Sequence, residues 1–550
     1  MNEIEIRLPD GSKVSLPYGS RAETLTDRFG ALSAPLVAVR ANNEIVPIAT
    51  RLEVNTTLEP VTLDTRDGSS IYRRSLSFLL ALAARELFPD QGLYVGHSLG
   101  NGYYYAFANE YKPTAEDIAA LDSRMREIVA EDLPIGFRYI AYADAQGVFT
   151  RNGQTDTALL LEQRSDAKVP VNECRGFLDL CVSPLVPRTS ILSSFELRAY
   201  ENGFLLRYPH TGAPSVAPFE DSPRIFSVYR EYKKWGRIVG VNAVGHLNQL
   251  VDSRGIKSFI QIAEAFQEKK LSEIADRIYE KRDSIRVILI AGPSSSGKTT
   301  TAKRLSIQLK VMGLEPMAIA LDDYFVGRDK TPKDAKGDPD YECLEALDVP
   351  LLNQNLLALF RGEEVELPIF DFKTGTRKET GRKMKLGRRT ILVMEGIHGL
   401  NDALTAQIDR DRKFKLYVSA LTQLNLDDHN RIPTSDNRLI RRMVRDHQFR
   451  SHDAAATIKM WPNVQAGEKK HIFPYQDSAD VAFNSALDYE LAVLKVYAEP
   501  LLRSVKPTMT EYSEAVRLLS FLGNFATIPP QYVPGSSILR EFIGESDFKY

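Results

Sequence analysis

Cysteines, long apolar runs and net charge are all scarce in this sequence, and each scarcity excludes a class of protein. The three cysteines, Cys174, Cys181 and Cys343, include no CxxC pair, so neither a disulfide framework nor a CxxC metal site is expected. Unpaired thiols suit a reducing compartment, and we predict a cytoplasmic protein. The longest apolar stretch, near residues 78–84, is far shorter than the roughly 20 residues that span a bilayer. We therefore expect no membrane-spanning segment.

The charge balance and the N-terminus exclude two further classes. The 550 residues carry a formal net charge of −2, so no overall field favours nucleic acid or an anionic membrane. The opening stretch, MNEIEIRLPDGS, alternates polar and apolar side chains and lacks the apolar core of a signal peptide. A chain of this length is too long for one hydrophobic core, and we expect three or more domains.

Residues 1–63 are predicted to form a small strand-rich domain. IEIRL and KVSLP alternate on either side of an Asp-Gly turn, which indicates a hairpin. A short helix at about 22–29 follows, and residues 36–46 form a second hairpin with Asn42 and Asn43 at its turn. This order suggests a β-grasp fold, and IEIRLPDGSKVSLPYGS resembles the TGS domain of threonyl-tRNA synthetases.

Residues 64–215 contain two stretches, 73–107 and 178–197, that resemble the second domain of the same synthetases. In the synthetases this domain edits mischarged tRNA through an H-x-x-x-H pair and a later C-x-x-x-H pair. The matching positions here are Arg74, Phe78, Cys181 and Leu185. Three of the four key residues are lost, so the resemblance implies an α+β module without editing activity. Cys181 is expected to be a buried small side chain.

The remaining chain is predicted to hold a helical connector (216–283), an α/β domain (284–505) and a C-terminal tail (506–550). Apolar residues recur at helical spacing over 256–282 and again over 512–525. From Ser284 on, short apolar runs alternate with amphipathic segments, which is typical of a parallel sheet. The candidate strands are 285–291, 316–321, 389–395, 414–420 and 479–484. The tail has no functional interpretation from its sequence.

The stretch IAGPSSSGKTT matches the phosphate-loop pattern G-x-x-x-x-G-K-[ST], between an apolar strand and an amphipathic helix. In such a loop the backbone N–H groups and the positive end of the helix bind the phosphates of a nucleotide. Lys298 is expected to reach the β- and γ-phosphates, and the Thr299 hydroxyl to bind Mg²⁺. The predicted nucleotide-binding residues are Gly292, Pro293, Ser294, Ser295, Ser296, Gly297, Lys298, Thr299 and Thr300.

Asp322 and Asp323 follow the second predicted strand of this domain. Ligands of open α/β sheets lie at the carboxyl ends of the strands. A kinase for a small alcohol needs a carboxylate there, which orients the attacking hydroxyl and accepts its proton. Taken alone, the pair could equally be two exposed residues that cap a loop.

Four stretches in order, IAGPSSSGKTT, LDDYF, VELPIFDFKTGTRKE and ILVMEGIHGL, resemble the uridine kinase/phosphoribulokinase family, and the uridine kinase branch most closely. The resemblance covers about 284–485. It implies a five-stranded P-loop kinase fold that transfers the γ-phosphoryl of ATP to a hydroxyl of a small metabolite. Asp322 matches the catalytic base, and Glu395 matches the carboxylate near Mg²⁺. Residues 437–458 resemble the family lid, which implies that Arg442, Arg445 and Arg450 neutralise the transferred phosphoryl group.

The acceptor half of the family pattern is less well kept. Phe370 takes the place of the family's aromatic hydroxyl, Gly375 that of a histidine and Phe325 that of a second tyrosine. Glu342 takes the place of a ribose-binding Asp, and His452 that of one lid Arg. A site that loses hydrogen-bonding groups discriminates differently, so another nucleoside or a polyol becomes a candidate acceptor. The predicted substrate-binding residues are Phe325, Glu342, Phe370, Arg377 and Arg442. The two phenylalanines are alternatively ordinary core aromatics.

These observations favour a kinase that uses ATP and Mg²⁺ and phosphorylates a nucleoside-like small molecule. The alternatives are a kinase of another hydroxyl metabolite and an RNA-linked regulatory P-loop NTPase. RNA is the less favoured partner, because the N-terminal half has no dense basic cluster. A pure scaffold would not need Lys298, Thr299, Asp322 and Glu395 together. The oligomeric state stays open.

Overall fold

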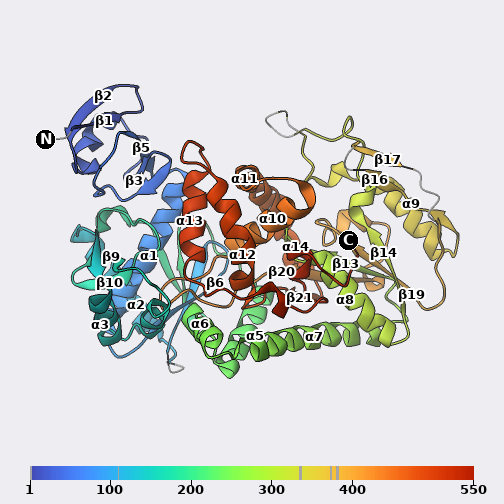
Figure 1. Cartoon of the computed structure of the whole chain (residues 1–550). Helices are drawn as coiled ribbons and strands as arrows, with labels where there is room; N and C mark the ends of the chain where they lie inside the picture. Colours follow the sequence, from blue (N-terminus) through green and yellow to red (C-terminus); the bar gives the residue numbers. More distant parts are fainter. Residues whose placement is uncertain are drawn as a thin grey trace. The chain divides into compact units, whose positions relative to one another are not determined.

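The computed structural model describes residues 3–108, 111–333, 337, 339–371, 374–378 and 383–549. The chain divides into two compact units (Figure 1). Unit 1 consists of residues 1–254, 422–433 and 499–527, and unit 2 consists of residues 255–421, 434–498 and 528–550. The five-part division expected from the sequence stays a prediction. No helix among the described residues combines the length and the apolar character that crossing a membrane requires.

Unit 1 begins with a five-stranded sheet that contains both predicted hairpins. Its strands are β1 (Glu3–Arg7), β2 (Lys13–Pro17), β3 (Leu36–Ala41), β4 (Glu44–Val46) and β5 (Thr56–Thr62), in the order β2-β1-β5-β3-β4. Asn42 and Asn43 have φ angles of 47° and 63° at the β3–β4 turn, as the tight turn between twisted strands requires. A 3₁₀ helix, Ala22–Phe29, covers the sheet, and Leu25 lies in its core. The β-grasp prediction is thereby confirmed.

The rest of unit 1 packs α1 (Arg66–Leu87) and α2 (Ala115–Ala130) with two antiparallel sheets around one apolar core. One sheet has the order β11-β12-β7-β6, with β6 (Leu93–Ser98), β7 (Gly102–Phe107), β11 (Glu196–Tyr200) and β12 (Gly203–Arg207). The other has the order β10-β9-β8, with β8 (Gly136–Ala141), β9 (Lys168–Cys174) and β10 (Phe177–Leu180). The helices α3 (Tyr142–Arg151), α4 (Thr155–Leu161), α5 (Pro223–Val239), α6 (Val244–Asp252) and α13 (Tyr512–Leu522) complete the unit.

Unit 2 is built on a parallel sheet, and all five strands predicted for it are present. They are β13 (Val287–Ala291), β14 (Glu315–Ala320), β19 (Thr390–Glu395), β20 (Lys413–Ser419) and β21 (Val481–Asn484), in the order β14-β19-β13-β20-β21. Every neighbouring pair is parallel. Strands β13 and β20 are buried along their whole length, as helices on both faces of a sheet require. The predicted P-loop α/β fold is confirmed.

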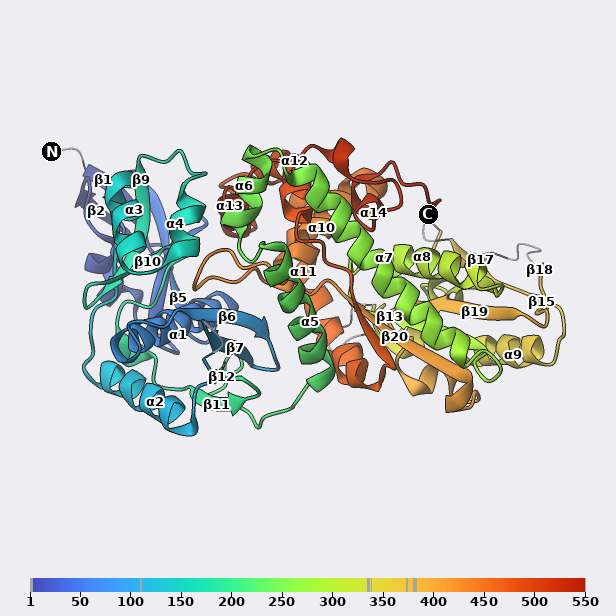
Figure 2. The same cartoon turned by 90° about the horizontal axis from the view of Figure 1, so that it is seen from below.

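Helices precede, connect and follow the strands of unit 2. They are α7 (Ile256–Glu280), α8 (Lys298–Val311), α9 (Val349–Phe360), α10 (Thr434–Arg450), α11 (Ala454–His471), α14 (Arg540–Ile543) and α12 (Glu490–Ser504), whose last residues, from Glu499 on, belong to unit 1. The long helix α7 runs beside α8 (Figure 2). Arg304 on α8 holds it there, donating to Gln267 at 2.6 Å and pairing with Glu268 at 2.6 Å.

Two short segments of the chain belong to a different unit than their sequence neighbours. Residues 422–433 leave β20 and enter α10, yet they pack within unit 1. The predicted tail, 506–550, is also divided, because its residues up to 527 belong to unit 1 and 528–550 belong to unit 2. The local composition of these segments did not predict to which unit they belong.

Candidate active site

The phosphate loop connects β13 to α8 and has little room for side chains at its glycines. A Cβ atom at Gly292 would lie 1.9 Å from the carbonyl oxygen of Val418, a backbone atom that cannot move aside. Gly297 has a φ angle of 81°, in the left-handed region that glycine adopts without strain. Helix α8 starts directly after it, at Lys298. The loop therefore has the tight turn that lets its N–H groups and the positive end of α8 face an anion.

The side chains that would bind a nucleotide and its metal lie together at this loop. Lys298 Nζ donates to the carbonyl oxygen of Pro293 at 3.3 Å, which keeps the ammonium group at the loop. The Thr299 hydroxyl donates to Glu395 Oε1 at 3.1 Å. Burial raises the pKa of Glu395 to about 7, with Asp322 adding to the rise and Lys298 opposing it. A buried carboxylate with a raised pKa ionises more easily when a cation binds beside it, so this position fits a bound metal ion.

The donor set fits Mg²⁺ held together with a nucleotide better than Mg²⁺ held by protein alone. Among the described residues, no group of three or more His, Cys, Asp or Glu side chains could bind a metal. Mg²⁺ is commonly bound by one or two protein oxygens, several waters and the phosphates of a substrate. Thr299 and Glu395 supply two such oxygens beside the loop.

Asp322 lies in the 3₁₀ helix Leu321–Tyr324 that follows β14, at the carboxyl end of the sheet, where the sequence placed it. Desolvation raises the pKa of its carboxyl group, while Lys298 and Arg450 oppose that rise. The side chain keeps access to solvent. The neighbouring Asp323 has a different role, since its Oδ1 accepts the N–H of Phe370 at 3.3 Å. Of the pair, Asp322 is the more exposed side chain.

Arg442, Arg445 and Arg450 converge on one carboxylate that was not predicted from the sequence. Asp446, on α10, is fully buried and pairs with Arg445 at 2.7 Å, with Arg442 at 3.2 Å and with Arg450 at 3.7 Å. Arg442 also donates to the Ser294 hydroxyl at 2.7 Å, which places α10 against the phosphate loop. Burial lowers the pKa of Arg442 and Arg450, and the neighbouring guanidinium of Arg445 adds to this. Mutual repulsion of this kind favours an anion beside the cluster.

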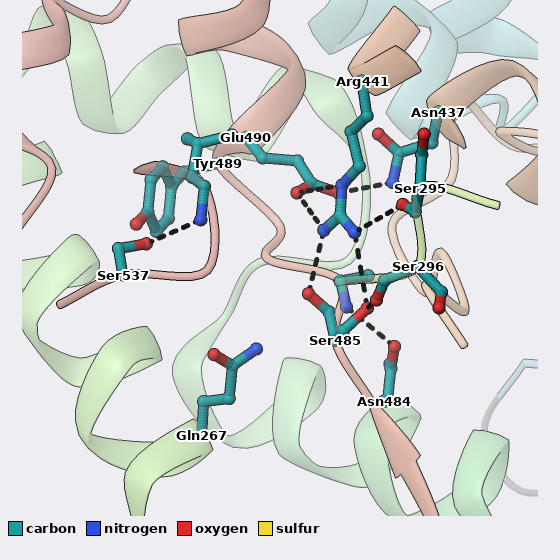
Figure 3. Close-up of polar contacts among 12 residues, drawn as sticks. Gln267, Ser295, Ser296, Asn437, Arg441, Asn484, Ser485, Tyr489, Glu490 and Ser537 are labelled. Atoms are coloured by element: carbon teal, nitrogen blue, oxygen red, sulfur yellow. Dashed lines mark hydrogen bonds and ion pairs between the residues drawn. The ribbon is translucent and has the colours of Figure 1, made fainter. Parts of the chain in front are cut away.

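Two buried ion pairs hold the phosphate loop from the side of α10. Arg441 lies between Glu490 and the loop (Figure 3), with Nε donating to Glu490 at 3.0 Å and Nη1 donating to the Ser295 carbonyl at 3.3 Å. Its Nη2 donates to the Ser485 carbonyl at 2.9 Å. Arg441 is fully buried and Glu490 is 2% exposed. Since a guanidinium has five donors in a fixed fork, one side chain fixes several acceptors at once.

The second pair joins Arg438 to Glu468. Arg438 Nη2 donates to Glu468 Oε2 at 2.7 Å, and Nη1 binds Oε1. Arg438 also donates to the Ser294 carbonyl at 3.1 Å, while Glu468 accepts the Ser294 N–H at 2.9 Å. Neither pair was predicted from the sequence. Their one local signal was the arginine repeat of α10, whose acidic partners lie far away in the chain.

The predicted acceptor residues fall into two groups. In the first, Glu342 interacts electrostatically with Arg442, and also with Asp322 and Lys298, and burial raises the pKa of Glu342 to about 7. In the second, Phe325, Phe370 and Arg377 contact one another. Phe325 and Phe370 have ring centroids 5.7 Å apart, and Arg377 donates to the Phe325 carbonyl at 3.1 Å.

The stretch that departs from the family pattern has little room for the missing groups. Arg377 forms an ion pair with Asp348 at 2.8 Å, which N-caps α9, so its guanidinium is engaged in the fold. Gly375 has a φ angle of 70°, and a Cβ atom there would lie 2.4 Å from Arg328 Cδ. A histidine at position 375 would therefore displace the Arg328 side chain.

In unit 1, Cys181 carries a thiol rather than a thiolate. Its Sγ donates to the Ser183 carbonyl at 3.3 Å, and burial raises its pKa to about 12. Arg74, which takes the place of an editing histidine, is close enough to oppose this rise electrostatically. A protonated thiol is neither a nucleophile nor a metal ligand. This environment is compatible with the expected loss of editing chemistry.

Comparisons with known proteins give two different relatives for the two parts of the chain. Residues 287–492 match the sequence model of the Phosphoribulokinase / Uridine kinase family. The N-terminal region is similar to threonine–tRNA ligases: the protein of Geobacter sp. (strain M21) is 33% identical over 205 residues, which are 37% of this chain and 32% of the ligase. The ligase of Burkholderia orbicola (strain MC0-3) is 32% identical over 197 residues, which are 35% of this chain and 31% of the ligase. The chain thus spans about a third of the length of these ligases.

Solved structures of kinases resemble the chain over less than half of its length. A possible uridine kinase from Bacillus stearothermophilus is 21% identical, with 39% of this chain and 98% of that chain covered and a TM-score of 0.25. D-glycerate 3-kinase from Cryptococcus neoformans is 16% identical, with 46% of this chain and 87% of that chain covered and a TM-score of 0.22. By the sequence comparisons alone, residues 287–492 are a domain of the Phosphoribulokinase / Uridine kinase family, joined to an N-terminal region homologous to threonine–tRNA ligases.

Proposed function

We propose that the protein is a kinase that uses ATP and Mg²⁺ to phosphorylate a hydroxyl group of a small molecule, with a uridine-like nucleoside as the first candidate. The observation that carries the proposal is the position of Asp322. Its carboxyl group lies within electrostatic reach of Lys298 on the phosphate loop and Arg450 on α10. A nucleotide switch has no acceptor hydroxyl to deprotonate, whereas a kinase requires a carboxylate at this place to accept the proton of the acceptor hydroxyl.

In this proposal, each group at the site has one task in the transfer. The loop N–H groups and Lys298 bind the triphosphate, while Thr299 and Glu395 would hold the metal ion, which supplies positive charge to the phosphate oxygens. Asp322 accepts the proton of the acceptor hydroxyl while the oxygen of that hydroxyl bonds to the γ-phosphorus. The bond from that phosphorus to the β–γ bridging oxygen breaks, and ADP leaves. Arg442, Arg445 and Arg450 stabilise the charge on the group in transfer.

The second candidate acceptor is a hydroxyl metabolite other than uridine. The packing of Gly375 against Arg328 favours it, because the histidine of uridine kinases has no equivalent there. Phe325 and Phe370 contribute no hydroxyl groups, so an acceptor base would gain stacking rather than hydrogen bonds from them. Glu342 supplies a carboxylate near Asp322, which suits an acceptor with a second hydroxyl group.

The test is phosphoryl transfer from ATP across a panel of nucleosides and small polyols, measured as phosphorylated product rather than as ADP. The wild-type protein is compared with Asp322→Asn and with Asp323→Asn. The second variant is a matched control, because an amide oxygen can still accept the Phe370 N–H. We expect Asp322→Asn to lower kcat by roughly 10²- to 10⁴-fold with nucleotide binding retained. Asp323→Asn should stay within a few-fold of wild type.

Two outcomes would contradict the proposal. If no compound of the panel is phosphorylated, and slow ATP hydrolysis is unchanged in Asp322→Asn, this carboxylate is not an acceptor base. The RNA-linked NTPase would then be the better interpretation, and salt-dependent RNA binding would be its next test. Equal loss of activity in both variants would indicate damage to the fold instead of loss of a proton acceptor.

A further inference from the structure

Two N–H groups of the phosphate loop and α8 are bound by carboxylates of the chain itself. Glu468 accepts the N–H of Ser294 at 2.9 Å. Glu541 accepts the N–H of Thr300 at 3.1 Å and its hydroxyl at 2.6 Å, through the same oxygen, Oε2. Thr300 lies in the first turn of α8, where N–H groups have no partner within the helix. Donors in this position are the ones that hold the phosphates of a nucleotide.

The two carboxylates differ in how firmly they are held. Glu468 is 1% exposed and is neutralised by Arg438, which is 4% exposed, so it belongs to the framework of the loop. Glu541 is partly exposed, and among the described residues it forms no ion pair. Its carboxylate accepts two hydrogen bonds from Thr300 and faces the positive end of α8. Glu541 is therefore the occupant that another anion can displace.

Packing around α14 holds the backbone that carries Glu541. Glu541 lies on α14, between Arg540, which donates to the Val533 carbonyl at 2.7 Å, and Phe542, which is fully buried. The ring of Phe542 packs against the Arg441 guanidinium, 4.9 Å from its centroid. Ile538 is also fully buried, and a Cβ atom at Gly297 would lie 2.7 Å from its Cγ2. A glutamate with three rotatable side-chain bonds can swing away from α8 while this packing stays in place.

We propose that Glu541 is an internal occupant of the nucleotide site, whose carboxylate holds the place of a nucleotide phosphate at Thr300 and leaves when a nucleotide binds. The inference rests on the proposed nucleotide at the phosphate loop and adds a competitor for it. The N–H of Thr300 has one hydrogen to donate, so a phosphate oxygen and Glu541 Oε2 compete for it. The phosphate and the Glu541 carboxylate also repel each other, and Glu541 interacts electrostatically with Glu395. The C-terminal segment thereby lowers the affinity of the site for nucleotides.

The test is ADP binding to the full-length chain, measured by calorimetry in the presence of a magnesium chelator and again with Mg²⁺. Glu541→Gln keeps the shape of the side chain and removes its charge, and Glu541→Ala removes the occupant. Glu545→Gln is the matched control, because Glu545 is on the same segment, is 86% exposed and pairs with Arg540. We expect ADP to bind about five- to twentyfold more tightly to Glu541→Gln than to wild type. Glu545→Gln should stay within about twofold.

Each other result would overturn the proposal. Unchanged ADP binding in Glu541→Gln would mean that the carboxylate does not compete with the nucleotide. Weaker binding, in particular only with Mg²⁺ present, would mean that Glu541 helps to hold a nucleotide-bound cation. Absence of ADP binding in wild type and in Glu541→Gln would show that no nucleotide site is being covered. If Glu541→Ala unfolds, Glu541→Gln alone decides. ADP binding needs no acceptor, so a failure to find a phosphorylated product leaves this comparison valid.

Discussion

The hydroxyl of Thr299 donates to Glu395 Oε1 at 3.1 Å, across a sequence separation of 96 residues. Thr299 is in the first turn of α8, and Glu395 is the last residue of β19. Strands β13 and β19 are direct neighbours in the parallel sheet, with Ile290 opposite Glu395. The sheet register therefore brings the end of β19 to the beginning of α8, where the metal of a P-loop kinase is expected.

Glu395→Gln should weaken the binding of the Mg²⁺ that activity requires. We expect the Mg²⁺ concentration for half-maximal activity to rise roughly 10- to 100-fold, because a neutral amide is a poorer ligand for a hard cation. In wild type, the raised pKa of Glu395, about 7, means that protons compete with the metal below that pH. Mg²⁺ titrations at several pH values should show this competition in wild type and not in Glu395→Gln. Ser306→Ala, later in α8, is the control and should leave the titration unchanged.

Asp446→Asn should lower kcat more than it weakens nucleotide binding. Without the carboxylate, Arg442, Arg445 and Arg450 lose the charge on which they converge and repel one another. We expect kcat to fall about tenfold to a hundredfold, since the arginines would no longer be positioned for the phosphoryl group. Steady-state kinetics and ADP binding separate the two effects. A large change in ADP affinity with kcat retained would contradict the assignment of these arginines to the transfer step.

The Arg441–Glu490 pair should show strong coupling in a double-mutant cycle. Removing one partner leaves the other charge buried, so Arg441→Met alone should destabilise unit 2 by about 3–5 kcal/mol. The double variant Arg441→Met with Glu490→Met should lose less stability than Arg441→Met alone, because no charge remains unpaired. Denaturant unfolding of the full-length variants measures both values. Additive effects would mean that the two charges are not coupled in the folded protein.

The stability of unit 1 should decrease as the pH rises from about 6.5 to about 9. His429 Nδ1 lies 3.2 Å from Asp179 Oδ1, and although burial alone would lower its pKa, Asp179, Asp428 and Asp427 raise it to about 9. A base whose pKa is raised by folding contributes stability that is full below its unfolded pKa and lost as the pH passes the folded value. Burial and neighbouring carboxylates raise the pKa of Asp427 as well, which acts in the same direction.

Thermal unfolding across this pH range should show a falling midpoint in wild type and a flatter profile in His429→Gln. The exposed His447 offers a control, and His447→Gln should follow wild type. A midpoint that is independent of pH in wild type would mean that His429 is already neutral near pH 7.

The strands and the phosphate loop could be predicted because their signals are local. β13 and β20 are continuous apolar runs, and the loop that follows β13 has glycines at fixed spacing. The turn at Asn42 and Asn43 is also local, since both residues tolerate positive φ angles. The aromatic stretch around Phe325 and Phe370 could only be left open, because phenylalanine suits a core and a binding site equally.

The carboxylates that complete the site could not be predicted, because each acts on a residue far away in the chain. Glu468 reaches Ser294 across 174 positions, and Glu541 reaches Thr300 across 241. An acidic residue in an amphipathic helix looks the same whether it faces solvent or a buried guanidinium. The three arginines of α10 had a visible pattern, but Asp446, on which they converge, could equally have been one more exposed charge.

The sequence by itself determined the parallel sheet of unit 2, its phosphate loop and the two carboxylates Asp322 and Glu395 that follow its strands, because spacing along a strand or loop is a local property. Only the tertiary structure decided which charges are buried and what they hold. It paired Arg441 with Glu490 beneath the loop, assigned residues 422–433 to unit 1 and brought Glu541 to the N–H of Thr300. These contacts depend on how distant segments pack against one another. The residues next to a charge in the sequence do not reveal whether the fold buries that charge.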